Sequence, residues 1–145
     1  MKFFKKQSTA GYLIDVTTVF ALIGLIFYIV TSTTGFLAGS SMDAWPIVLS
    51  IFTIAIGVGV FFFGDSLKGW MIDIILPAMC VLLSATLCLF VIDRLSLFAD
   101  VWFIPVNYPA AEGVLLNISI VGIAFYIASI ILTVSAGFMD KLVKE

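Results

Sequence analysis

Two aspartates occur in nearly the same local sequence. Residues 11–15 read GYLID and residues 69–73 read GWMID, so Asp15 and Asp73 each lie about one helical turn inside a long apolar run. A carboxylate inside a membrane span suggests function, because at the bilayer centre it costs roughly 2.5–3.5 kcal/mol. The pair is therefore a candidate site for a proton, a cation or a basic substrate group at a cytoplasmic vestibule.

A structural interpretation of the same pattern stays open. An aromatic residue followed by an acid suits the start of a membrane helix, where the ring lies at the interface and the acid complements the helix dipole. We expect both aspartates in the first turn of a helix, capped by backbone amides or paired with Lys5, Lys6 or Lys68. The echo also suggests two duplicated helical hairpins, although apolar sequences produce such matches by chance.

The composition of the chain indicates whether water or lipid surrounds it. Its 145 residues are 63% hydrophobic and 11% charged, with a mean hydropathy of +1.26. Soluble domains have roughly 45–50% apolar and about 25% charged residues, so lipid is the expected surrounding. No basic run supports nucleic-acid binding. The chain has no histidine, and no catalytic set, metal-ligand cluster or cofactor motif is present. We therefore expect neither an enzyme, a metal site nor a cofactor.

The apolar runs predict an all-α, polytopic membrane protein with one domain over residues 1–145. About 20 helical residues cross the ~30 Å hydrocarbon core. Polar breaks divide the chain into four expected spans, at residues 11–34, 45–64, 69–93 and 111–138. These would form a four-transmembrane-helix bundle. The aromatic-rich residues 95–104 predict a short interfacial helix between the third and fourth spans.

The basic residues predict the orientation. All six lysines lie in the N-terminal tip, the connection between spans two and three, or the C-terminal tail, whereas the single arginine, Arg94, follows span three. The positive-inside rule then places both termini in the cytoplasm. The preference for lysine and the short connections favour a multi-pass protein of the plasma membrane, specifically a bacterial inner membrane.

Polar and aromatic residues mark the ends of the spans. On the outer face Arg94 and Glu112 could pair, and Asn117 could bond across helices or contact a ligand. The outer-face candidates are Asp93, Arg94, Asp100, Glu112 and Asn117. Aromatic residues suited to the membrane interface are Tyr12, Trp45, Trp70, Trp102 and Tyr108.

These observations predict a small integral membrane protein that acts as a non-enzymatic subunit or scaffold through helix–helix packing. Its expected partners are membrane lipids and either further copies of itself or another membrane protein. Two alternatives stay open. One is a small oligomeric transporter or channel with Asp15 and Asp73 at an acidic cytoplasmic vestibule, and the other is a lipid-interacting protein.

Overall fold

The described part of the chain is all-helical. The computed structural model describes residues 8–35, 42–104 and 110–139, and no strand occurs among them. The elements are α1 (Thr9–Thr33), α2 (Trp45–Phe63), the short 3-10 helix η2 (Gly64–Ser66), α3 (Gly69–Phe103) and α4 (Ala110–Gly137). All four α-helices are long and apolar enough to cross a membrane. The prediction of four apolar helices is therefore confirmed.

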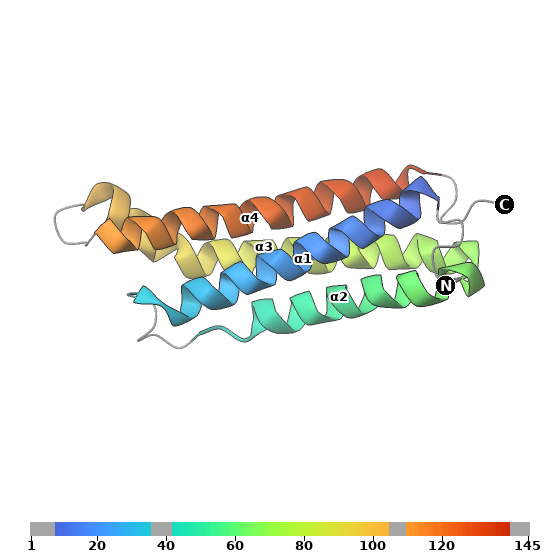
Figure 1. Ribbon diagram of the computed structural model, residues 1–145, viewed down its shortest axis with the longest axis horizontal. Coiled ribbons are helices and arrows are strands. Elements are labelled where there is room, and N and C mark those ends of the chain that lie inside the picture. Colours follow the sequence, from blue (N-terminus) through green and yellow to red (C-terminus); the bar gives the residue numbers. More distant parts are fainter. Residues whose placement is uncertain (1–7, 36–41, 105–109, 140–145) are drawn as a thin grey trace, which may run out of the picture.

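The helices form a four-membered antiparallel bundle (Figure 1). α1 packs against α2 and α4, and α3 also packs against both of these helices. α1 and α3 thus start at the same end of the bundle, where α2 and α4 finish. We call this the terminal end; the opposite end, where α1 finishes and α2 begins, is the distal end.

Local sequence explains the helix starts at both ends. The Ser8 hydroxyl caps α1 by accepting a hydrogen bond from the Gly11 amide at 3.4 Å. At α2 the Asp43 carboxylate accepts from the Trp45 amide at 3.1 Å, and Pro46 occupies the first turn, where its missing N–H costs nothing. These contacts fix where the chain enters the bundle.

α3 differs from the prediction, because it does not stop before residue 95. Residues 95–103 are helical, but they continue the same 35-residue helix rather than forming a separate interfacial element. At 1.5 Å per residue α3 is about 52 Å long, well beyond the ~30 Å hydrocarbon core. The last turns of α3 therefore extend past the length that a membrane core covers. Pro77 lies inside this helix.

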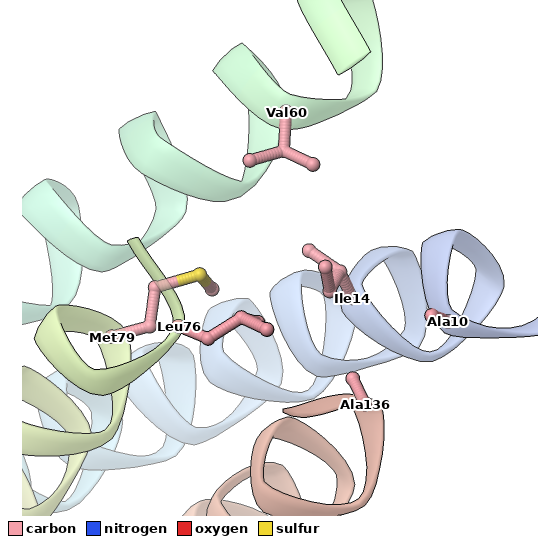
Figure 2. Packing of buried hydrophobic residues seen from close by; sticks show 6 residues of the cluster. All are labelled: Ala10, Ile14, Val60, Leu76, Met79 and Ala136. Atoms are coloured by element: carbon pink, nitrogen blue, oxygen red, sulfur yellow. The ribbon is translucent and has the colours of Figure 1, made fainter. Parts of the chain in front are cut away.

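The interior holds two apolar clusters. The cluster near the terminal end is shown in Figure 2 and joins all four helices through Ala10, Ile14, Val60, Leu76, Met79 and Ala136. The second, farther along the bundle, is built around Ala21, Tyr28, Leu83, Phe90 and Tyr126. In lipid, such packing stabilises through close van der Waals contact rather than through removal of water.

Candidate functional site

The two echoed aspartates have different surroundings. Asp15 is half-buried on α1, whereas Asp73 is exposed on α3. Neither lies in the first turn of its helix, which corrects that expectation, because α1 begins at Thr9 and α3 at Gly69. Asp73 borders a groove between α3 and α4, and Asp15 is not among the residues that line it.

A buried arginine organises the distal end instead. Arg94 of α3 is 2% exposed. The two N–H groups of its Nη2 are shared among three acceptors, the Thr31 hydroxyl at 3.0 Å, the Tyr28 carbonyl at 3.3 Å and the Ser32 hydroxyl. These acceptors lie in the last two turns of α1, where the helix dipole favours a cation. Arg94 thus binds the C-terminal part of α1 to α3.

Aromatic rings surround the guanidinium. The Arg94 Cζ lies 5.2 Å from the ring centroid of Tyr28 and 5.4 Å from that of Phe90. The two rings meet edge to face, with centroids 5.0 Å apart. Cation–π contacts gain strength where water is excluded, so the rings help offset the cost of burying the charge.

Tyr28 extends the site to a carboxylate and to the start of α2. Its hydroxyl lies 2.6 Å from the Asp93 carboxylate and 3.0 Å from the Asp43 carbonyl. One hydroxyl has one proton, so it donates to only one of these acceptors at a time. We refer to Tyr28, Thr31, Ser32, Asp93 and Arg94 as the arginine cluster.

The arginine cluster continues into the middle of the bundle. Phe90 contacts Tyr126 of α4 edge to face, with ring centroids 6.0 Å apart. The Tyr126 hydroxyl in turn lies 2.7 Å from the Ser50 hydroxyl of α2. Through these contacts the arginine cluster is connected to all four helices.

The other outer-face candidates are Asp100, Glu112 and Asn117. The hydrogen bonds that Arg94 makes to described residues go to α1, so the suggested pairing with Glu112 is not one of them. Glu112 is 8% exposed, with its carboxylate close to Gly35, which has a φ of +66°. Asn117 is exposed and Asp100 is half-buried.

Four of the five aromatic residues proposed as interfacial anchors are exposed at the two ends of the helices. Tyr12 and Trp70 lie near the terminal end, and Trp45 and Trp102 near the distal end. The remaining one, Tyr108, lies outside the described residues.

Sequence reasoning found the charged members of the arginine cluster but missed Tyr28, Thr31 and Ser32. A signal was present: these three polar residues lie near the end of a mostly apolar run, at spacings that put them on one face of a helix. They can be assigned to the same depth in the bundle as Arg94 only when α1 and α3 are both recognised as membrane-spanning helices. The chemistry available here is hydrogen bonding and charge compensation.

Within the described ranges, no three His, Cys, Asp or Glu side chains come together as a potential metal site. The fold and this site define a class, a multi-pass helical bundle suited to a membrane. No family model matches the chain, and no curated protein or solved structure shows significant similarity to it.

Proposed function

We propose that this chain is a non-enzymatic membrane subunit or scaffold, which acts by packing against further copies of itself or another membrane protein. One observation carries the proposal: among the described residues, the buried hydroxyls other than that of Ser119 form hydrogen bonds inside the bundle. Thr17 and Ser129, for example, link α1 to α4 through reciprocal contacts with backbone carbonyls. Such contacts support a rigid body rather than a reaction centre.

The outward surface supports the same proposal. Every helix carries large exposed apolar side chains, including Val19 of α1, Phe52 of α2, Val81 of α3 and Ile131 of α4. In a bilayer these groups contact either lipid or another protein. Lateral packing in lipid depends on close approach, and Gly59 provides a place for it, because a β-carbon there would meet nothing within 4 Å.

The association can be tested by native mass spectrometry from a mild detergent. We expect the wild-type chain to appear as an oligomer or with a partner membrane protein. Leucine at Ala55 and Gly59, two small positions on the outward face of α2, should weaken that complex by at least about tenfold in Kd. Ile51→Val, an exposed change on the same helix, is the matched control. A wild-type protein that stays monomeric and crosslinks to no partner would contradict the proposal.

We also propose that both termini are cytoplasmic and that the chain resides in a bacterial inner membrane. The support is the distribution of lysines against Arg94, together with the shared end at which α1 begins and α4 finishes. A phosphatase reporter fused after Glu145 should be inactive, and a cytoplasm-active fluorescent reporter at that position should be bright. The reverse pattern would invert the assignment.

A lipid-binding role is the second candidate, and a specific observation favours it. Trp102 and Phe103 are 64% and 82% exposed at the distal end of α3, beyond the length that a hydrocarbon core covers. Such aromatics suit the headgroup region. The same native mass spectra report retained lipid, so lipid adducts without protein association would favour this role. Transport through a vestibule shared by Asp15 and Asp73 has less support, because Asp73 alone borders the groove.

A further inference from the structure

A groove opens between α3 and the C-terminal part of α4, at the terminal end of the bundle. Its volume is about 290 Å³. Among the described residues that line it, Asp73 is the only charged one, and apolar residues such as Leu76 and Val134 form most of the rest. Phe138 also lines it and is 86% exposed. One carboxylate in an apolar groove calls for a ligand with one positive charge and a hydrophobic body.

Pro77 gives the groove a second polar feature. In an α-helix the carbonyl of residue i accepts from the amide of residue i+4, and Pro77 stands four residues after Asp73 without an N–H. The Asp73 carbonyl therefore lacks its regular helical donor. Asp73 and Pro77 both line the groove, and from this we infer that the carbonyl and the carboxylate of Asp73 can act as two acceptors for one ligand.

We propose that this groove binds a lipophilic primary ammonium ion. Two of its N–H groups would bond the carboxylate and the carbonyl of Asp73, and charge-assisted bonds of this kind are about twice as strong as neutral ones. The alkyl or aryl body would lie against Leu76 and Val134, with Phe138 beside the cation. A zwitterionic phospholipid fits less well, since its phosphate would approach Asp73 and the lining residues that the structure describes include no basic side chain.

Trp70 provides a reporter, because it lies one turn before Asp73 on α3. In a Trp45→Phe, Trp102→Phe background, 8-bromooctylammonium should quench Trp70 fluorescence with saturation. Asp73→Asn should weaken that binding by at least about tenfold. Asp15→Asn is the matched control: it removes the other echoed carboxylate and should leave the affinity unchanged. Circular dichroism of each variant establishes that the helices are intact.

Two further probes separate the features of the site. The trimethylammonium analogue has no N–H and should bind more weakly than the primary amine, and Pro77→Ala, which restores an amide, should reduce that difference. Equal quenching by 8-bromooctanol and the ammonium probe, or unchanged binding in Asp73→Asn, would overturn the proposal. The proposal would also be overturned if phosphatidylethanolamine displaced the probe as effectively as octylammonium, because the groove would then bind lipid.

Discussion

Arg94→Leu is expected to lower the free energy of unfolding by about 3 kcal/mol. Hydrogen bonds to charged groups are each worth about 1.5–3 kcal/mol, and the two N–H groups of Arg94 Nη2 are shared among three acceptors on α1. The variant also loses contacts with two aromatic rings. Against this, leucine no longer requires the desolvation of a cation. The net loss is therefore smaller than the sum of the individual bonds.

The measurement is unfolding in mixed micelles, followed by circular dichroism as the denaturing detergent fraction rises. Arg94→Lys should lie between wild type and Arg94→Leu, since an ammonium keeps the charge but loses the planar fork and its stacking. Leu95→Ala is the control: Leu95 is 61% exposed, so its truncation should change stability by less than about 0.5 kcal/mol. A leucine variant as stable as wild type would show that the arginine cluster does not hold α1 to α3.

The number and approximate position of the helices follow from sequence because hydropathy over some 20 residues is a strong local signal. The residue at which α3 ends does not follow from sequence in the same way. Residues 95–103 are rich in aromatics and contain Asp100, a pattern that fits both an interfacial helix and the continuation of a span. In the structure these residues continue the span. Local composition could not distinguish this arrangement from an interfacial helix.

The burial of Arg94 also could not be predicted from its neighbours in the sequence. Next to Asp93 and before a polar connection, it suggested an exposed residue paired with Glu112. Its observed partners are a backbone carbonyl and two hydroxyls of α1, 62 to 66 positions earlier in the chain. Charge attraction can be anticipated between residue types, whereas hydrogen bonds to carbonyls depend on which helices become neighbours.

The two echoed aspartates also show that local sequence does not determine the surroundings of a residue. Asp15 and Asp73 have matching sequence neighbours but different surroundings, since one is half-buried and the other exposed beside a groove. A local repeat therefore predicted two similar positions along their helices. Which face of each helix turns inward depends on packing with α2 and α4.

Gly24→Val should destabilise the bundle by about 3 kcal/mol. Gly24 is buried on α1, and a β-carbon there would lie 2.8 Å from Cε2 of Tyr126. That ring is fully buried and its hydroxyl bonds Ser50, so the ring has little room to move. Overpacking of this kind costs about 1–3 kcal/mol, and displacement of Tyr126 would add about 1 kcal/mol for the bond to Ser50.

Gly113→Val is the matched control, because the same change in a second helix, α4, meets open space and should shift stability by less than about 0.5 kcal/mol. A double-mutant cycle identifies the clash. In a Tyr126→Ala background the valine at position 24 gains room, so the cost of Gly24→Val should fall to about 1 kcal/mol or less. Equal costs with and without the tyrosine ring would mean that α1 and α4 do not approach each other through Gly24.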